Sequence, residues 1–119
     1  MTANDVIHGA IMRLGYVSDE GNSPILENAM RRSLSILNEL YFELHNICFE
    51  GKEFTQINDP NEEIKLPDKA AIALIYGLAA FIAQSENDSD NANWYLRCYN
   101  LKRAGLSTRT KRVDTLPRV

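Results

Sequence analysis

Two histidines and two cysteines are the side chains of this sequence best suited to binding a metal or attacking a substrate: His8, His45, Cys48 and Cys98. Structural zinc sites draw on pairs of such residues at short spacings, and these four do not form two such pairs. A cysteine and a histidine can also meet in space as a nucleophile and its base, but nothing around either cysteine supports that pairing. We interpret all four as structural or surface positions, and we expect neither a metal nor a cofactor.

Neighbouring carboxylates are the second group that could do chemistry, as general acids or bases. They occur in three places, each beside the Gly, Asn or Ser residues of a predicted turn or strand edge: Asp19-Glu20, Glu62-Glu63 and Asp88 with Asp90. Solvated turns are the usual setting for such clusters, and the sequence has no glycine-rich phosphate-binding loop. We therefore expect no enzymatic activity.

Aromatic and basic residues are interleaved towards the C-terminus. The aromatic residues are Trp94, Tyr95 and Tyr99, and the basic ones are Arg97, Lys102 and Arg103. Such a mixture can form a platform on which nucleic-acid bases stack, with cations around it. At helical spacing it is also typical of residues that pack between helices, and this is the interpretation we favour.

Charge is distributed unevenly along the 119 residues, whose formal total is −3. Residues 1–96 hold six basic and fifteen acidic residues, a formal charge of −9. Residues 97–119 hold seven basic residues and one acidic residue, a formal charge of +6. A basic end on an acidic body indicates a docking segment or a contact with a polyanion. Its cations could pair with nucleic-acid phosphates or with carboxylates of a protein partner, or they could only keep the chain soluble.

Length and composition limit the possible classes of protein. Hydrophobic residues make up 45% of the sequence and charged residues 24%, as in an ordinary globular protein of one domain. No apolar run reaches the roughly 18 residues that a membrane span needs. The first residues lack the basic start and apolar stretch of a secretion signal. We expect a soluble, intracellular, single-domain protein that does not bind a membrane.

Two helices are predicted in the first half of the chain. Thr2 and Asp5 have the spacing of a capping box, and the apolar stripe that follows ends at Gly15, a residue suited to the left-handed conformation that closes a helix. Ser23-Pro24 is a second helix start. The stripe that follows is the longest in the sequence, and we expect it to end near His45–Asn46.

Two more helices are predicted in the second half. Asp68 is the predicted cap of a helix whose residues 70–83 are apolar on all sides, as in a buried core helix. Small residues at 73, 77, 80 and 83 would let a partner helix approach it closely. The fourth helix is predicted over residues 91–104, and Gly105 is expected to end it.

A short β-hairpin is predicted between the second and third helices. Residues 53–58 and 62–66 alternate in polarity on either side of an Asn-Asp-Pro-Asn turn. The predicted fold is therefore mainly α: a small bundle of about four helices, a short β-hairpin insertion at about 53–66 and an extended C-terminal tail. The helical domain covers residues 1–105, and the basic tail covers residues 106–119.

The order of these segments resembles the head-to-tail connector proteins of tailed phages, above all the packaged-DNA stabilisation, or tail accessory, adaptor of short-tailed phages. The opening helix within residues 5–18 contains Arg-Leu-Gly, and a long amphipathic helix includes residues 28–40. A Leu-Pro pair then introduces the alanine-rich helix of residues 66–80. The basic, proline-containing residues 107–118 resemble the segment after the last helix of those adaptors.

The resemblance implies a non-enzymatic protein of the virion neck, assembled in the host cytoplasm. Such adaptors form a ring, usually of twelve copies, under the portal protein. They extend the DNA channel, retain packaged DNA without sequence-specific binding and provide a platform for tail proteins. The family grips the portal with the segment after its last helix, which corresponds here to Arg109, Lys111, Arg112, Leu116, Pro117 and Arg118. The alternative is a small helical nucleic-acid-binding or regulatory protein that uses the basic C-terminus.

Overall fold

The computed structural model describes residues 1–15 and 24–115, with side-chain positions for residues 1–15 and 32–106. Its helices are α1 (Ala3–Leu14), α2 (Pro24–Cys48), α3 (Asp68–Ser85) and α4 (Ser89–Thr115). The prediction of a mainly α, small bundle of four helices is therefore confirmed. In the part of the chain that is described, β pairing is limited to one isolated antiparallel bridge, between Thr2 and Glu63.

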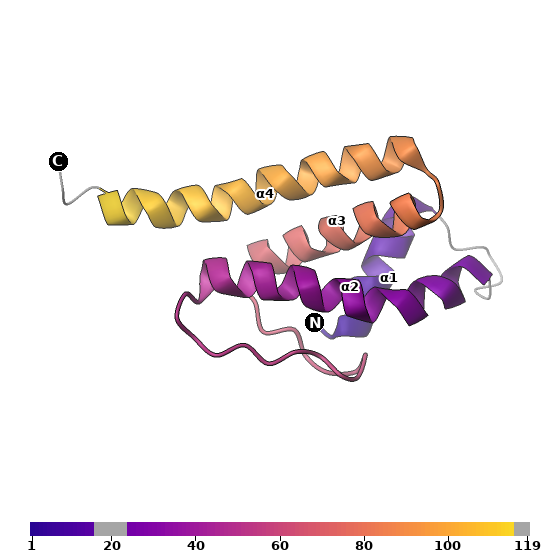
Figure 1. The fold of residues 1–119 in the computed structure, drawn as a ribbon, viewed down its shortest axis with the longest axis horizontal. Helices are drawn as coiled ribbons and strands as arrows, with labels where there is room; N and C mark the ends of the chain where they lie inside the picture. Colours follow the sequence, from indigo (N-terminus) through magenta and orange to yellow (C-terminus); the bar gives the residue numbers. More distant parts are fainter. Residues whose placement is uncertain (16–23, 116–119) are drawn as a thin grey trace.

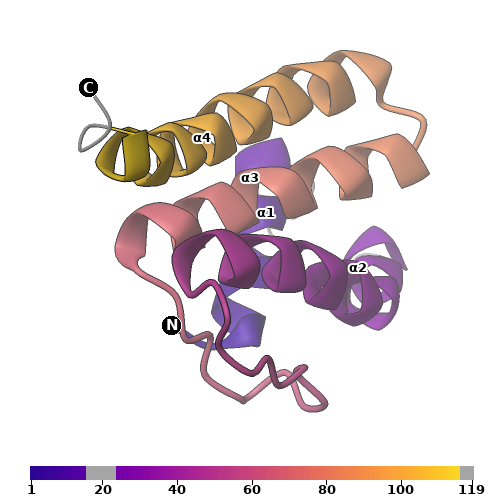
Figure 2. The same ribbon diagram turned by 60° about the vertical axis from the view of Figure 1, so that its left-hand side comes forward.

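α3 lies at the centre of the bundle. α4 runs antiparallel along one side of it, while α1 and α2 pack against its other sides (Figure 1). The loop that joins α2 to α3, residues 49–67, lies on the side of α3 away from α4 in both views (Figure 2). α3 therefore separates α4 from this loop, so α4 and the loop form surfaces on opposite sides of the molecule.

α1 begins and ends as predicted. The Thr2 hydroxyl accepts a hydrogen bond from the Asp5 amide at 3.1 Å, and the Asp5 carboxylate accepts one from the Thr2 amide at 2.9 Å. Hydrogen bonding to Thr2 holds the pKa of Asp5 below its usual value. Gly15 closes the helix in the left-handed conformation, with φ of 72°. The predicted apolar face is buried, at Val6, Ile7, Ala10, Ile11 and Leu14.

α2 begins at Pro24, as predicted, whereas Ser23, its predicted cap, lies outside the described residues. The predicted stripe is buried where side chains are described, at Ser33, Leu37, Leu40, Tyr41 and Leu44. The helix continues past the predicted end, to Cys48.

α3 is the buried helix that the sequence predicts. The proposed cap is wrong: Asp68 is the first helical residue, and Pro67 precedes it without a side-chain hydrogen bond to the helix. The small residues at 73, 77, 80 and 83 are all buried, and Gly77 marks a close approach between helices. A Cβ atom added to Gly77 would lie 2.8 Å from Tyr99 Cδ1 of α4 and 3.2 Å from Leu40 Cδ1 of α2. Only a residue without a side chain lets these helices come so close.

The predicted β-hairpin at 53–66 is wrong, because α2 binds the backbone of its first half. The Asn38 side-chain amide donates to the Ile57 carbonyl at 2.8 Å, and the Asn38 side-chain oxygen accepts from the Ile57 amide at 2.7 Å. Both backbone groups of Ile57 are thereby satisfied without a strand partner, and its side chain is buried.

The second half of the predicted hairpin pairs with the N-terminus instead. The Ala3 amide donates to the Glu62 carbonyl and the Ile64 amide donates to the Met1 carbonyl, both at 2.9 Å. The Met1 ammonium also contacts the Glu63 carboxylate at 2.9 Å, which raises the pKa of this amino group. These bonds take the groups that a hairpin would use, so residues 53–66 form a loop bound to α1 and α2.

The predicted stop of the last helix at Gly105 and the extended tail after it are also wrong. α4 runs through Gly105 to Thr115, so residues 106–115 are helical, while residues 116–119 lie outside the described part. Gly105 does not adopt the positive φ that ends a helix. A glycine inside a helix costs only about 1 kcal/mol relative to alanine. Leu106 packs against the core immediately after it, which supports the continued helix.

Candidate interaction surfaces

The histidines and cysteines are dispersed. His8 is exposed on α1, whereas His45 is buried beside the rings of Phe49 and Phe54, with ring centroids 5.2 and 5.4 Å away. Cys48 and Cys98 are free and half-buried, and burial raises the pKa of the Cys48 thiol. In the described part of the chain, no three His, Cys, Asp or Glu side chains lie close enough to hold a metal ion.

Three side chains of the described carboxylate clusters are bound to nearby backbone or to the N-terminus: Glu62, Glu63 and Asp88. Glu62 accepts hydrogen bonds from the amides of Asn58 and Asp59 at 3.2 and 3.1 Å. Glu63 pairs with the N-terminal amino group. Asp88 accepts from the Asn91 amide at 3.3 Å and so caps the start of α4. Asp19 and Glu20 lie outside the described residues.

The aromatic residues of α4 do not form one platform. Trp94 is 57% exposed, whereas Tyr99 is 3% exposed and fills the space above Gly77. Tyr95 is half-buried, and its ring stacks on Tyr76 of α3 with centroids 5.8 Å apart. The interpretation as residues that pack between helices is therefore confirmed for Tyr95 and Tyr99, but not for Trp94.

Tyr99 joins α4 to α2 through a charged partner that the sequence does not reveal. Its hydroxyl donates to the Glu43 carboxylate, whose other oxygen accepts from Arg103 Nη1 at 2.9 Å. The Arg103 guanidinium also lies 5.8 Å from the centre of the Tyr99 ring. Burial and the adjacent Glu43 raise the pKa of Tyr99. This contact fixes the middle of α4 against the bundle.

A second polar cluster, which we call the cation cluster, surrounds Tyr76 where α1, α3 and α4 meet. Arg13 Cζ lies 5.2 Å and Lys102 Nζ 4.9 Å from the centre of the Tyr76 ring, both within the range of a cation–π contact. The Tyr95 hydroxyl donates to the Arg13 carbonyl at 2.9 Å, which ties α1 to α4. Sequence reasoning missed this cluster, because its members come from three separate helices.

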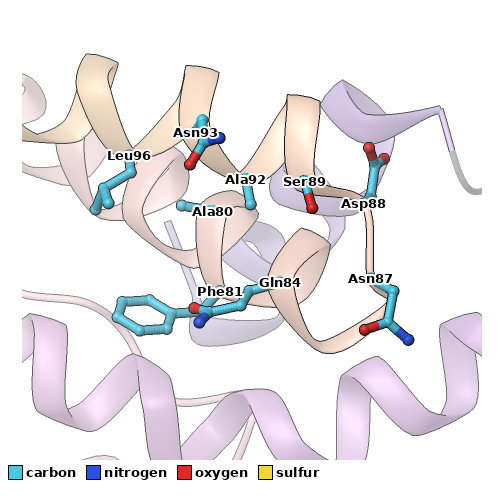
Figure 3. A pocket seen from close by; sticks show the side chains of 9 residues that line it. All are labelled: Ala80, Phe81, Gln84, Asn87, Asp88, Ser89, Ala92, Asn93 and Leu96. Carbon is cyan, nitrogen blue, oxygen red and sulfur yellow. The ribbon is translucent and has the colours of Figure 1, made fainter.

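A pocket of about 340 Å³ lies at the turn between α3 and α4 (Figure 3). Phe81 and Leu96 provide apolar surface, the amides of Gln84, Asn87 and Asn93 provide neutral polar groups, and Asp88 and Ser89 also line the pocket. Phe81 and Leu96 are 37% and 42% exposed, so both can still lose surface to a partner. Apolar walls beside amides and a carboxylate suit a short protein segment or a small polar molecule.

The outer side of α4 carries a separate apolar stripe. Trp94 and Leu101 are two turns apart on the same side of the helix, and they are 57% and 68% exposed. Arg97 lies between them and is also exposed. A large exposed aromatic and a leucine beside an arginine are the residue types enriched at protein interfaces.

The basic residues predicted to bind a partner lie at the free end of α4. Arg109, Lys111 and Arg112 are in its last turns, whereas Leu116, Pro117 and Arg118 lie outside the described residues. A groove lined by Lys69 and Leu106 shows that the start of α3 lies level with Leu106. Residues 107–115 therefore continue past α3, and Figure 1 shows this end of α4 projecting from the bundle.

In the described part, no helix has the length and apolar character to cross a membrane.

Comparisons with known proteins identify no relative of this chain. No protein-family model matches the sequence, and no curated protein and no solved structure matches it either. What the surfaces of this chain can bind must be judged from its own residues: a projecting basic helix end, a cation cluster and exposed apolar positions on α4.

Proposed function

We propose that this protein is a structural head-to-tail adaptor of a tailed phage or prophage. It would assemble as a ring under the portal protein, extend the DNA channel, retain packaged DNA and offer a platform to tail proteins. The order of segments along the sequence supports this proposal, and the mainly α bundle is compatible with it. The acidic body suits a channel wall, since like charge lets DNA slide without sticking.

The observation that carries the proposal is the projecting end of α4. Residues 107–115 contain three basic residues and one acidic residue and continue beyond α3, away from the contacts that hold the bundle together. A basic helix end in this position can reach a neighbouring protein without disturbing the fold. In a ring, each copy repeats the same contact, so a weak contact gives strong attachment through avidity.

The test is native mass spectrometry of the full chain, alone and mixed with the portal protein encoded in the same genome. We expect a complex in which several copies of this chain bind one portal ring. Deletion of residues 107–119 should abolish the complex while the bundle stays folded, because every described side chain that packs against the core, up to Leu106, is kept.

A charge-only variant separates the role of the cations from that of the helix. Replacing Arg109, Lys111 and Arg112 by glutamine removes three charges, and glutamine favours helices about as well as lysine or arginine. This variant should bind the portal at least about tenfold more weakly, since several charge-assisted contacts would be lost. Absence of any complex between wild type and the portal would refute the adaptor proposal. Full portal binding by both the deletion and the glutamine variant would refute the role of the basic end of α4.

The second candidate is a small helical nucleic-acid-binding or regulatory protein that uses the same basic end. It is favoured by the cations concentrated in the last third of the chain. The discriminating measurement is duplex-DNA binding by the isolated protein at two salt concentrations. Several phosphate contacts would make the affinity fall by about a thousandfold or more between 50 and 200 mM salt. The adaptor proposal expects little binding at either concentration.

A further inference from the structure

The cation cluster holds two like charges beside one ring. Arg13 and Lys102 are both exposed, and each lies close to the centre of the Tyr76 ring. The charges can be no farther apart than the sum of their two distances to that centre. Among the described residues, neither side chain has a carboxylate within ion-pair distance, although Arg13 Nη1 donates to the Gly9 carbonyl at 3.3 Å. Two cations beside one ring, with no carboxylate of the described residues in ion-pair distance, favour a bound anion.

A third cation lies beside the cluster. Lys69, at the start of α3, lines a groove of about 370 Å³ together with Lys102 of α4. Ile72 and Leu106 provide apolar surface in this groove, and Gly105 leaves it open because no side chain fills the space. The groove can therefore receive a side chain that has an apolar stem and an anionic end, which describes glutamate.

The opposite side of the molecule carries the complementary charge. The loop of residues 49–67 contains five acidic and two basic residues, whereas α4 contains six basic and two acidic residues. The two regions lie on opposite sides of α3 (Figures 1 and 2). Glu50 and Glu53 are exposed, and within the described residues neither takes part in an ion pair or a side-chain hydrogen bond. These carboxylates are available to a partner.

We propose that the cation cluster binds the acidic loop of a second copy of this chain. Arg13 and Lys102 of one copy would pair with Glu50 and Glu53 of the next. A nucleic acid fits less well, since residues 1–96, to which Arg13 and Tyr76 belong, carry a formal charge of −9 and repel a polyanion. A short loop with a few carboxylates places its negative charge at the cation cluster and not along the acidic remainder of the surface.

The contact is head-to-tail, because it joins different surfaces of identical chains. Such contacts build closed rings when the rotation between copies closes, and open filaments when it does not. The inference deepens the proposed function by naming the surfaces through which neighbouring copies meet. It depends on the proposed function for one part only, the closure of these contacts into a ring beneath a portal. Salt-sensitive self-association of the isolated chain is its direct consequence.

The experiment is sedimentation velocity of the full chain at 50 and 500 mM salt, with two charge-reversal variants. The cluster variant carries Arg13→Glu and Lys102→Glu, and the loop variant carries Glu50→Lys and Glu53→Lys. Wild type should self-associate at low salt and dissociate at high salt. Each variant alone should associate at least about tenfold more weakly, because like charges then face each other. An equimolar mixture of the two should associate again, since each reversed surface meets its complement.

Recovery in the mixture also shows that both variants are folded. The matched control is Lys52→Glu with Lys65→Glu, which changes the net charge by the same amount as the cluster variant but on the loop side. It should associate at least as well as wild type. The inference is overturned if wild type is monomeric at low salt, or if the mixture associates no better than its two components. It is also overturned if the cluster variant loses only affinity for a duplex oligonucleotide.

Portal binding by the same variants separates this inference from the proposed function. Loss of self-association with retained portal binding, seen by native mass spectrometry, supports both. Normal self-association without any portal binding contradicts the proposed function alone. Portal binding by a chain whose self-association is insensitive to both salt and charge reversal contradicts this inference alone.

Discussion

α3 and α4 pack side by side, yet they meet their surroundings in opposite ways. Eleven of the eighteen residues of α3 are buried, including Leu74 and Leu78 at 0% exposure. Among the described side chains of α4, Tyr99 is the one that is buried. α3 is therefore held by the hydrophobic effect on nearly every side, whereas α4 is held along one side and leaves the rest of its surface to solvent.

The difference separates two roles within one hairpin of helices. A change in α3 should act on the stability of the whole bundle, because its side chains contact three other helices. A change on the free sides of α4 should leave the fold intact and act on binding. Substitutions in the core of α3, at its contact with α4, between α4 and α2, and on the outer side of α4 test this difference.

Truncation of the α3 core should have the largest effect. We expect Leu78→Ala to lower the free energy of unfolding by about 3 kcal/mol, since a fully buried leucine is replaced by a cavity. Ile72→Ala, on the exposed side of the same helix, should cost less than about 1 kcal/mol. Urea denaturation followed by circular dichroism measures both. Equal losses from the two variants would contradict the description of α3 as a helix with one exposed side.

The glycines of the two helices should respond to alanine with opposite signs. Gly77→Ala should destabilise by about 1–2 kcal/mol, because overpacking against Tyr99 outweighs the gain in helix propensity. Gly105→Ala should stabilise by about 0.5–1 kcal/mol, because nothing lies within 4 Å and the residue is helical. Thermal unfolding of the pair checks this. Destabilisation by Gly105→Ala would show that α4 does not continue through this position.

The bond between Tyr99 and Glu43 should have a moderate effect. Tyr99→Phe should lower the free energy of unfolding by about 1.5 kcal/mol, since a hydrogen bond to a charged group is lost and Glu43 keeps only Arg103. In a background that already carries Glu43→Gln, the same substitution should cost less. A double-mutant cycle in urea measures the coupling. Simple additivity would mean that this contact does not hold α4 in place.

The outer side of α4 should have the smallest effect on stability. Trp94→Ala and Leu101→Ala should each change the free energy of unfolding by no more than about 0.5 kcal/mol, because both side chains are more than half exposed. Chemical denaturation of the two variants beside wild type is the check. A loss comparable to that of Leu78→Ala would show that this side is buried in a folded assembly, and concentration-dependent unfolding would then identify it as an interface.

Local chemistry made much of the fold predictable. The capping box of Thr2 and Asp5 and the left-handed Gly15 depend on residues within one turn of each other, and the structure has both. The apolar periods of α1 and α2 likewise indicated which residues are buried, and the continuous apolar run of α3 indicated a core helix. The predicted hairpin failed because its competitor was distant in sequence: the Asn38 side chain occupies the Ile57 backbone groups, and nothing near Ile57 indicates this.

The surfaces were less predictable than the core. A single glycine near the end of a helical pattern predicted that the last helix stops at Gly105. The helix continues instead, because Leu106 packs against the core directly after Gly105. The cation cluster combines Arg13, Tyr76 and Lys102 from three helices, so spacing along the sequence carries no trace of it. The basic residues at the end of α4, by contrast, were identifiable from charge alone.

Hydrogen exchange can show whether the basic end of α4 attaches this chain to the portal protein. Amide exchange of the full chain would be followed by mass spectrometry, alone and with the portal protein of the same genome. We predict new protection in residues 107–115 on binding and unchanged exchange in the already buried α3. Portal binding with no change of exchange in residues 107–115 would contradict the claim.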